Sequence, residues 1–404
     1  MKVCFVSHSS DRGGAGTMLL RLLDGLRLRG VECSVLLPRE GPLREEVAAR
    51  QLPFAVLPYA WWAHRRQGLR ERIRDFAALR GLGRIVSQLR RWDVDLIVTN
   101  TCVVPFGALA ALALKRPHVW YVHEFGQADH GLSFYLGFAL TCKLMARLST
   151  LIIVNSKAVA ELYSRYIPRA RIRVIYCGVD LPPRSGIQTP LANNSRPSRL
   201  VLVGSYQPGK GQMVAIRALK HLIDQQVRAE LVLVGAIGDV PYWDELKRTA
   251  LECHLEREVF FEPYNDDPGA IMTEGDVILM CSRSEAFGLV TVEGMKLGKP
   301  VVGARSGATP ELIKEGFNGL LYAPDDPADL AAKVRYLLEN PAIAKRMGDN
   351  GRRWAEDTFS VGKYIDAMLY VFNDVLGRGN GPQVLDEEPG AESSPRSRSY
   401  SSAG

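Results

Sequence analysis

Two successive series of short apolar runs, separated by helix-like stretches, constrain the fold of this chain more than any other feature. Runs of this kind, such as "KVCFVSH" and "RLVLVG", are typical of parallel strands that are buried on both faces. The first series lies at 2–8, 32–38, 54–59, 95–100, 118–124, 151–156 and 173–178, and the second at 199–204, 229–235, 259–263, 277–282, 300–304 and 319–324. This alternation predicts an α/β fold with two doubly wound, Rossmann-like domains that face each other across a cleft.

Changes in composition place the domain boundaries. Residues 181–198 are rich in Pro, Ser and Asn, and we expect them to link an N-terminal domain at 1–180 to a C-terminal domain at 199–358. Residues 359–376 have apolar positions at helical spacing, which predicts a C-terminal helix that returns to the N-terminal domain. The composition of residues 377–404 predicts a disordered tail, either merely solvated or used for docking or phosphorylation.

The overall composition favours a protein that works in water and in a reducing compartment. The chain is 47% hydrophobic and 24% charged, and we recognise no secretory leader. The longest apolar stretch, at 132–148, is too short to span a bilayer and contains Lys143 and Arg147, so we expect a buried or interfacial helix. Seven cysteines with no C-x-x-C pair argue against a disulfide framework and a zinc cluster. A cytoplasmic location follows.

Positive charge is concentrated in one segment. Residues 65–91 contain nine arginines and only two acidic residues, whereas the whole chain carries a net charge of +7. A local patch of this kind argues against nucleic acid as a partner. Residues 61–92 also include three tryptophans and apolar positions at helical spacing. They predict either a surface helix packed on the sheet or an interfacial helix on an anionic membrane.

Ligands of open parallel sheets bind outside the carboxyl ends of the strands, so the loops at those ends hold the candidate residues. The loop "SHSSDRGGAG" follows the first strand, and Gly13, Gly14 and Gly16 would let backbone N–H groups approach an anion at a helix start. The loop resembles a dinucleotide fingerprint only loosely, because Leu19 occupies the third glycine position. Hydride-transfer chemistry is therefore a weak alternative.

The loop "VGSYQPGKG" follows the first strand of the second domain. It presents Lys210 between Gly209 and Gly211 at a strand-to-helix turn. Loops often carry a lysine for solubility alone, but this position favours a lysine that is directed at a phosphate group.

The segment "EAFGLVTVEG", residues 285–294, carries two glutamates around a glycine turn. Glu285 lies in the loop after a strand, and a helix is expected to begin near Leu289 with Glu293 about one turn in. Both carboxylates would then border one pocket. Since a carboxylate can accept two hydrogen bonds, each suits a pair of vicinal hydroxyls, one on a ribose and one on a sugar.

The chain resembles the retaining glycosyltransferases of family four, known as glycosyl transferases group one, which have the two-Rossmann GT-B architecture. The resemblance rests on the E-x7-E pair, the continuation "GKPVVGARSGATPELI", the G-x4-GKG loop, the GGA loop and "VIYCGVD" before the linker. It covers residues 1 to about 376. It implies transfer of a sugar from a nucleotide-diphosphate sugar to a hydroxyl acceptor, lipid-linked or part of a glycan, by an enzyme that needs no metal or other cofactor. Lipid-linked acceptors would favour peripheral contact with the inner face of the membrane.

The resemblance also implies a role for each candidate residue. Glu285 would hold hydroxyls of the donor sugar, Glu293 the ribose, and Lys210 the diphosphate, while His123 would lie beside the transferred sugar. The N-terminal domain would bind the acceptor and the C-terminal domain the nucleotide sugar. Backbone N–H groups would assist at Gly14, Ala15, Phe287, Gly288, Leu289 and Val290. An ordinary histidine at a strand end is the alternative interpretation of His123.

Two positions depart from the family pattern. Ser205 stands where many members have an arginine that provides a second cation for the diphosphate, and Cys177 stands where many have asparagine. Arg283 or Arg305 could replace the missing cation. The departure at Ser205 keeps a non-catalytic nucleotide-sugar-binding protein open as an alternative, together with a nucleotide-sugar 2-epimerase of the same architecture.

The resemblance implies a same-face substitution in which the departing phosphate helps to deprotonate the acceptor hydroxyl. No spare carboxylate stands in a clear position for a covalent intermediate, because Glu124 should point away from His123 on its strand. The pair Asp93 and Asp95 superficially resembles a metal-binding D-x-D motif. It precedes its strand, at the edge away from the expected ligand, and we predict a strand-entry turn there.

Overall fold

The computed structural model describes residues 1–11, 13–64, 68, 75, 78–181, 196–264 and 267–378. Most of the predicted linker, much of the basic segment 61–92 and the predicted tail from residue 379 onward lie outside the described residues.

The first β/α series forms a seven-stranded parallel sheet with the order β3-β2-β1-β5-β6-β8-β9. The strand order reverses between β1 and β5, and such a switch point is where doubly wound sheets bind ligands. The strands are β1 (Lys2–Ser7), β2 (Glu32–Leu37), β3 (Phe54–Val56), β5 (Leu96–Asn100), β6 (His118–Val122), β8 (Leu151–Val154) and β9 (Ile172–Val174). A separate antiparallel pair joins β4 (Ala63–His64) to β7 (Ser133–Phe134).

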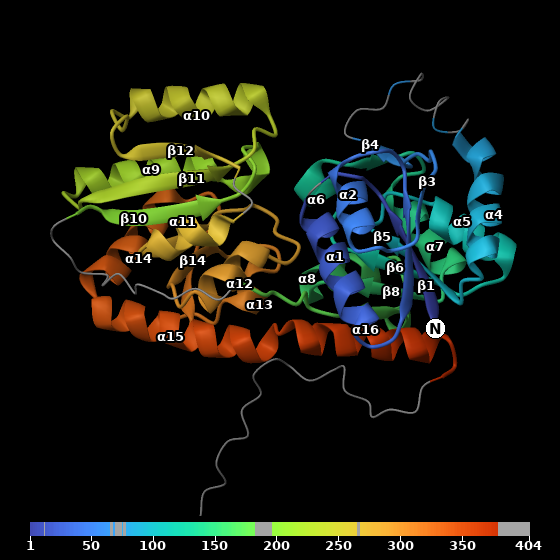
Figure 1. The fold of residues 1–404 in the computed structure, drawn as a ribbon. Helices are drawn as coiled ribbons and strands as arrows, with labels where there is room; N and C mark the ends of the chain where they lie inside the picture. The colour runs from blue at the N-terminus through green and yellow to red at the C-terminus, as the bar shows by residue number, and fades with distance from the viewer. Residues whose placement is uncertain are drawn as a thin grey trace, which may run out of the picture.

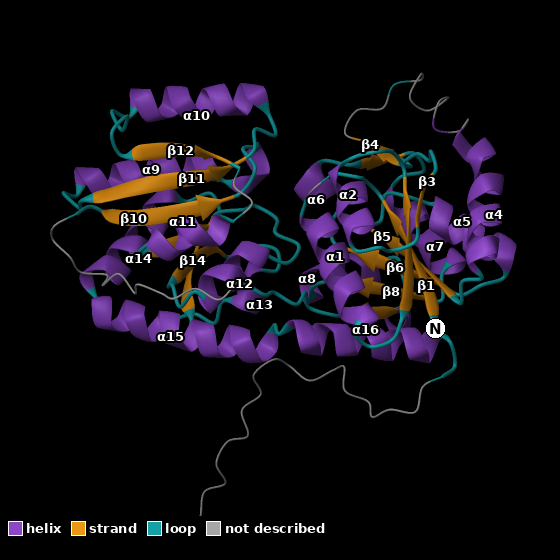
Figure 2. Ribbon diagram, in the orientation of Figure 1, coloured by secondary structure: helices purple, strands orange, loops and turns teal. Residues whose placement is uncertain are grey.

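Helices cover both faces of this sheet, as Figure 2 shows. One face packs against α1 (Gly14–Arg27) and α2 (Pro42–Ala49). The other face packs against four further helices, here called the outer helix layer: α4 (Leu82–Trp92), α5 (Phe106–Leu114), α7 (Phe138–Leu148) and α8 (Lys157–Ser164). Short elements complete the domain, namely α6 (Gln127–His130) and the 3₁₀ turns η1 (Ala78–Gly81) and η2 (Arg169–Arg171).

The second series forms a six-stranded parallel sheet with the order β12-β11-β10-β13-β14-β15. Its strands are β10 (Ser198–Val203), β11 (Ala229–Gly235), β12 (Val259–Pro263), β13 (Val277–Met280), β14 (Val301–Ala304) and β15 (Gly319–Tyr322). Its helices are α9 (Gln212–Asp224), α10 (Val240–Glu252), α11 (Pro268–Glu274), α12 (Leu289–Lys296), α13 (Thr309–Leu312), α14 (Pro327–Glu339) and α15 (Pro341–Thr358), with the 3₁₀ turn η3 (Pro208–Lys210). The structure therefore contains the two predicted doubly wound α/β units.

The apolar stretch 132–148 does not form one helix. It contains β7 and then α7, and Gly137 between them has a φ of +73°, a left-handed conformation that only glycine adopts readily. Within the described part of the chain, no helix has both the length and the apolar character needed to cross a bilayer.

Two successive helices near the C-terminus, α15 and α16 (Val361–Val375), join the two domains. Figure 1 shows α15 and α16 running in succession beneath both domains, so that α16 lies under the N-terminal sheet. There α16 packs against α1 so closely that a Cβ atom on Gly25 would lie 2.4 Å from Cγ1 of Ile365. At the crossing point, the Phe359 ring lies 5.8 Å from Tyr176 and 5.7 Å from Phe287. These aromatic contacts link the two hydrophobic cores.

Candidate functional site

The carboxyl ends of the two sheets meet at the start of helices α1 and α12. A Cβ atom on Gly14 would lie 3.9 Å from Cδ1 of Leu289, so the two helix starts approach each other across the domain boundary. Both helices begin after a glycine, Gly13 and Gly288, and no described side chain caps either of them. The first N–H groups of a helix have no partner within it, and the helix dipole makes this end positive. Two adjacent uncapped helix starts form a surface that suits an anion.

Lys210 and Glu285 form an ion pair beside these helix starts. Nζ of Lys210 lies 2.9 Å from Oε2 of Glu285, and the side chains are 29% and 16% exposed. The charge of Glu285 raises the pKa of Lys210 and outweighs the burial that would lower it, with a further contribution from Asp129. Lys210 therefore stays positive in a partly buried site, where its charge is screened less than at the surface.

Glycine makes the turn at Lys210 possible. Gly211 has a φ of +73°, and a Cβ atom there would lie 2.1 Å from the carbonyl oxygen of Cys281. The buried amide of Gln212 fixes the same loop, since its Nε2 donates to the carbonyl oxygens of Gly204 and Ser205 at 3.2 and 2.9 Å. The loop is thus held in a form that presents Lys210 at the carboxyl end of β10.

A glycine also shapes the turn after Glu285. Gly288 has a φ of +99° immediately before α12, which only glycine adopts readily at this bend. The side chain of Phe287 is 3% exposed and packs among the aromatic residues at the domain junction. Any contribution of Phe287 to ligand binding must therefore come from its backbone, as the sequence predicts.

Glu293 lies in the second turn of α12 and is largely buried. Burial raises the pKa of its carboxyl group, and the positive charge of Arg21 partly offsets this effect. Arg21 belongs to α1, in the other domain, and donates to the carbonyl oxygens of Gly178 and Asp180 at 3.4 and 3.3 Å. No pattern in the sequence selects Arg21, because its proximity to Glu293 arises only when the two domains pack.

His123 approaches the same region from the end of β6. Its Nε2 lies 2.7 Å from Oδ1 of Asn100, while Nδ2 of Asn100 donates to the carbonyl oxygen of Ala15 at 3.2 Å. Burial, together with a smaller contribution from the nearby charge of His8, lowers the pKa of His123 to about 3. The imidazole is therefore neutral at physiological pH and donates its Nε2 proton to Asn100. Asn100, which the sequence did not single out, connects His123 to the GGA loop.

The neighbouring carboxylate, Glu124, has a different environment. It is 5% exposed and accepts hydrogen bonds from the backbone N–H groups of Cys102 and His123, at 2.7 and 2.9 Å. These contacts hold Glu124 inside the N-terminal domain and identify it as a buried structural acid.

The remaining charged candidates are engaged elsewhere. Nε of Arg283 lies 2.9 Å from Oδ1 of Asp325, and Nη2 of Arg305 lies 3.0 Å from Oε2 of Glu315. Both guanidinium groups thus pair with carboxylates of their own domain, and the structure shows neither contacting Ser205.

The aspartates of the D-x-D sequence also have partners. Asp93 pairs with Lys2 at 3.6 Å and with Arg116 at 3.2 Å, and Asp95 accepts a hydrogen bond from the Lys2 backbone at 2.9 Å. They lie at the amino end of β5, as expected for a strand-entry turn. Among the described residues, no group of three or more His, Cys, Asp or Glu side chains could hold a metal ion.

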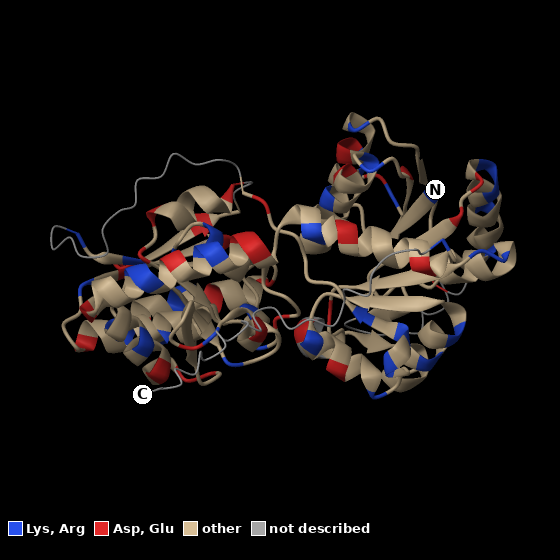
Figure 3. Cartoon of the chain, turned by 90° about the horizontal axis from the view of Figure 1, so that it is seen from below, with Lys and Arg blue, Asp and Glu red and all other residues tan. Residues whose placement is uncertain are grey.

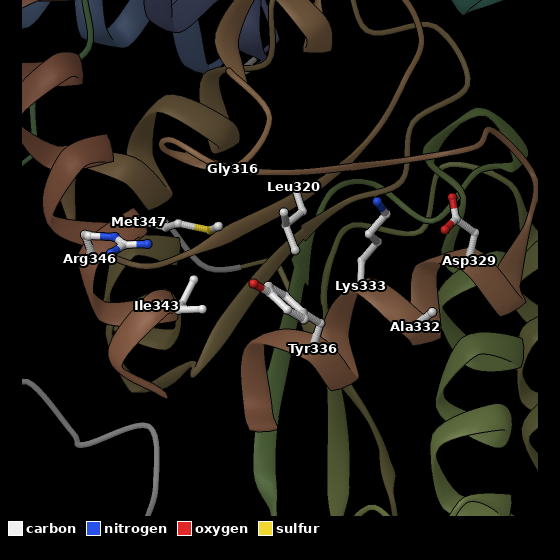
Figure 4. A pocket seen from close by; sticks show the side chains of 9 residues that line it. All are labelled: Gly316, Leu320, Asp329, Ala332, Lys333, Tyr336, Ile343, Arg346 and Met347. Carbon is white, nitrogen blue, oxygen red and sulfur yellow. The ribbon is translucent and has the colours of Figure 1, made fainter. Parts of the chain in front are cut away.

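A separate hollow of about 500 Å³ lies on the C-terminal domain, between β15, α14 and α15 (Figure 4). Leu320, Tyr336, Ile343 and Met347 supply its apolar lining, and Lys333 and Arg346 supply positive charge. None of the candidate site residues lines it.

Two parallel-sheet α/β domains that meet at paired helix starts, with a Lys-Glu pair of the C-terminal domain beside these starts, match the GT-B architecture of glycosyltransferases. Comparison with known proteins agrees with this assignment. The family model described as glycosyltransferase family 4 matches residues 12–182, and the model described as glycosyl transferases group 1 matches residues 186–354. The chain therefore belongs to the group 1 glycosyltransferases.

Individual relatives and solved structures support the same family. An uncharacterized glycosyltransferase of Methanocaldococcus jannaschii is 30% identical over 176 residues, which cover 43% of this chain and 48% of that protein. A D-inositol 3-phosphate glycosyltransferase of Streptomyces bingchenggensis is 25% identical over 369 residues, 85% of this chain and 75% of the relative. The crystal structure of Anabaena HepE in complex with UDP-glucose has a TM-score of 0.77 and 25% identity, covering 93% of this chain and all of that one. The matches to the first two curated relatives span about half of each relative's length.

Proposed function

We propose that this protein transfers a sugar from a UDP-sugar to a hydroxyl group of a glycan or lipid-linked acceptor, with retention at the anomeric carbon. The observation that supports the proposal is the Lys210–Glu285 pair beside the uncapped starts of α1 and α12. Lysine and helix N–H groups suit a diphosphate, while the carboxylate suits sugar hydroxyls. UDP is the first nucleotide to test because HepE was crystallised with UDP-glucose.

In the proposed reaction the bond between the anomeric carbon and the diphosphate breaks, and a bond to the acceptor oxygen forms on the same face of the sugar. The proton of the acceptor hydroxyl moves to the departing diphosphate. Lys210 and the N–H groups at Gly14, Ala15 and the 287–290 turn stabilise the leaving negative charge, so no metal is required. The neutral imidazole of His123 would pack beside the sugar without adding charge.

Binding and turnover assays distinguish this proposal from its alternatives. Calorimetry with UDP and UDP-glucose should show binding by the wild-type protein, and a panel of glycan acceptors should yield a new glycoside. Donor turnover without an acceptor would instead indicate a 2-epimerase. Nucleotide binding with no transfer to any acceptor would favour a non-catalytic binding protein, for which Ser205, in place of the common arginine, is the supporting observation. Absence of nucleotide binding would refute the proposal.

The outer helix layer supports a membrane-borne acceptor. In this layer and the segments next to it, residues 78–92, 106–116, 133–148 and 165–173 contain twelve Lys and Arg residues and no Asp or Glu, while α8 itself adds Lys157 and Glu161. Five large apolar side chains on the same layer are exposed to water: Leu79, Leu112, Leu136, Leu140 and Tyr166. Figure 3 shows basic residues outnumbering acidic ones along the lower right margin of the N-terminal domain. Exposed apolar groups among cations suit the surface of an anionic bilayer.

Sedimentation with liposomes tests this surface. The wild-type protein should pellet with vesicles of phosphatidylcholine and phosphatidylserine at low salt, and less with pure phosphatidylcholine. Reversing Arg84, Arg91 and Lys143 to Glu should abolish most binding, since each cation near such a surface contributes about 1 kcal/mol. The matched control reverses Arg257, Arg346 and Arg352 of the C-terminal domain and should pellet like wild type. Equal losses of vesicle binding in both triple variants would show that the net charge of the protein, and not this surface, determines the binding.

A further inference from the structure

A carboxylate of the C-terminal domain caps a helix of the N-terminal domain. Glu311, on α13, accepts hydrogen bonds from the backbone N–H groups of Lys157 and Ala158, at 2.9 and 2.7 Å. It also accepts one from the Tyr176 hydroxyl at 2.8 Å. The next N–H group of α8, on Val159, is capped by the Ser156 hydroxyl within the same domain. Glu311 thus supplies the partners that the first turn of α8 would otherwise lack.

The segment that carries Glu311 also contacts the backbone of Glu285. The N–H group of Ala308 donates to the carbonyl oxygen of Glu285 at 2.8 Å, and the N–H group of Glu311 donates to that of Ala308 at 2.9 Å. Gly307 has a φ of +54°, and a Cβ atom there would lie 2.5 Å from the Glu285 carbonyl oxygen. Two hydrogen bonds and a tight glycine contact therefore connect the backbone of Glu285 to Glu311.

The helix that Glu311 caps is connected in turn to His123. Asn155 directly precedes the capping residue Ser156, and its Nδ2 donates to the carbonyl oxygen of His123 at 3.2 Å. A continuous series of contacts thus runs from Glu285 through Ala308 and Glu311 to α8, and from there to His123. It joins the two sides of the candidate site by a route that does not pass through the ligand.

We propose that Glu311 is a positioning residue for sugar transfer, an inference that rests on the proposed function. Its carboxylate sets the separation of Glu285 and His123 by fixing the C-terminal domain to the start of α8. A carboxylate suits this position because the helix start carries partial positive charge, and a charged acceptor forms stronger hydrogen bonds than a neutral one. Loss of the cap should separate the two sides of the site without removing any group that contacts the donor.

Hydrogen exchange measures the cap directly, without any substrate. The Lys157 and Ala158 amides should be protected in wild-type protein and should exchange about ten- to a hundredfold faster in Glu311→Ala, the range expected for losing hydrogen bonds to a charged group. Lys157→Pro removes one of the donors while proline remains favourable at the first position of a helix. Lys157→Ala is its matched control because it keeps the N–H group and removes only the side chain.

Kinetics then separate positioning from a merely structural role. With UDP-glucose and an accepted glycan, Glu311→Ala and Lys157→Pro should lower kcat about tenfold or more, leave the Kd for UDP within about twofold, and leave the unfolding transition cooperative. Glu311→Gln keeps one carbonyl oxygen and should recover part of the rate, while Lys157→Ala should match wild type. Unchanged exchange or unchanged kcat in both Glu311→Ala and Lys157→Pro would overturn the inference. Failure of wild-type protein to bind UDP would instead overturn the proposed function, which the exchange result does not depend on.

Discussion

The two sides of the interdomain site differ in charge. The C-terminal domain contributes an ion pair, Lys210 and Glu285, together with the largely buried Glu293. The N-terminal domain contributes a histidine, His123, whose pKa is lowered to about 3 and whose partner is the amide of Asn100. The Lys210–Glu285 pair is thus charged and the His123–Asn100 pair is neutral, although Arg21 and Asp129 of the N-terminal domain also act on Glu293 and Lys210.

Under the proposed function, this difference predicts how the two sides divide the work of transfer. A diphosphate carries negative charge before and after the reaction, so fixed positive charge on the C-terminal side can stabilise both binding and departure. A sugar ring and its acceptor are neutral, and a protonated histidine beside them would favour the wrong distribution of charge. We therefore expect large effects on transfer or UDP binding when charges on the C-terminal side are changed. Protonation of His123 on the N-terminal side should have little effect on transfer.

The largest effect should follow removal of the Lys210 charge. We expect Lys210→Ala to lower kcat by about a hundredfold or more, as the loss of a preorganised charge stabiliser usually does. Lys210→Arg, which keeps the charge, should retain more activity than Lys210→Ala. Steady-state kinetics with UDP-glucose measure both variants. Equal rates for Lys210→Ala and wild type would remove the main distinction between the two sides.

A smaller effect should follow loss of the Glu293 carboxylate. Glu293→Ala should weaken UDP binding by about 1.5–3 kcal/mol, because ribose hydroxyls lose a charged acceptor. Glu285→Gln provides the matched comparison, since it should lower transfer while leaving UDP affinity nearly intact. Isothermal calorimetry of the folded variants decides between them. Similar losses of UDP affinity in both would show that the two glutamates do not divide ribose and sugar as proposed.

A positive charge added at position 205 should strengthen UDP binding modestly, in contrast to the weakening expected for Glu293→Ala. Ser205→Arg should tighten UDP binding about five- to tenfold, corresponding to about 1 kcal/mol or slightly more for a new charged hydrogen bond. Ser205→Ala controls for loss of the hydroxyl and should bind UDP like wild type. Weaker binding by Ser205→Arg would mean that another cation already occupies the space.

Protonation of His123 should not contribute to the pH dependence of kcat near neutral pH. Its folded pKa of about 3 lies below the ordinary value of 6.5, so the imidazole is neutral above about pH 4 and gains a proton only as the pH falls through 3. The dependence of kcat on pH between 5 and 8 should therefore have the same shape in wild type and in His123→Asn. A rate transition near pH 6.5 that disappears in His123→Asn would show that the N-terminal side does carry charge during the reaction.

Local sequence was sufficient for the residues that act within one loop. Gly211, Lys210, Glu285 and Gly288 could be selected because a strand, a glycine turn and a helix start follow each other directly along the chain. The two parallel sheets were predictable for the same reason, since nearly continuous apolar runs fit strands buried on both faces. The helix expected over 132–148 was partly wrong because Gly137 adopts a left-handed conformation between β7 and α7.

Residues that act through partners in other segments of the chain could not be selected in this way. Asn100, Arg21 and Glu311 are ordinary polar residues in their own segments, and no periodicity distinguishes them. Each acquires its role from a partner far along the chain: Asn100 from Ala15 and His123, Arg21 from Gly178 and Asp180, and Glu311 from the start of α8.

The sequence alone thus determined the two α/β domains and the charged loops of the C-terminal domain, because strand burial, glycine turns and helix starts depend on neighbouring residues. The tertiary structure alone decided which N-terminal groups meet those loops, the low pKa of His123 and the capping of α8 by Glu311. Those properties depend on burial and on distances of a few ångströms between segments that are separated along the chain. Folding of the N-terminal domain sets these distances around His123, and packing of the two domains sets them at Glu311.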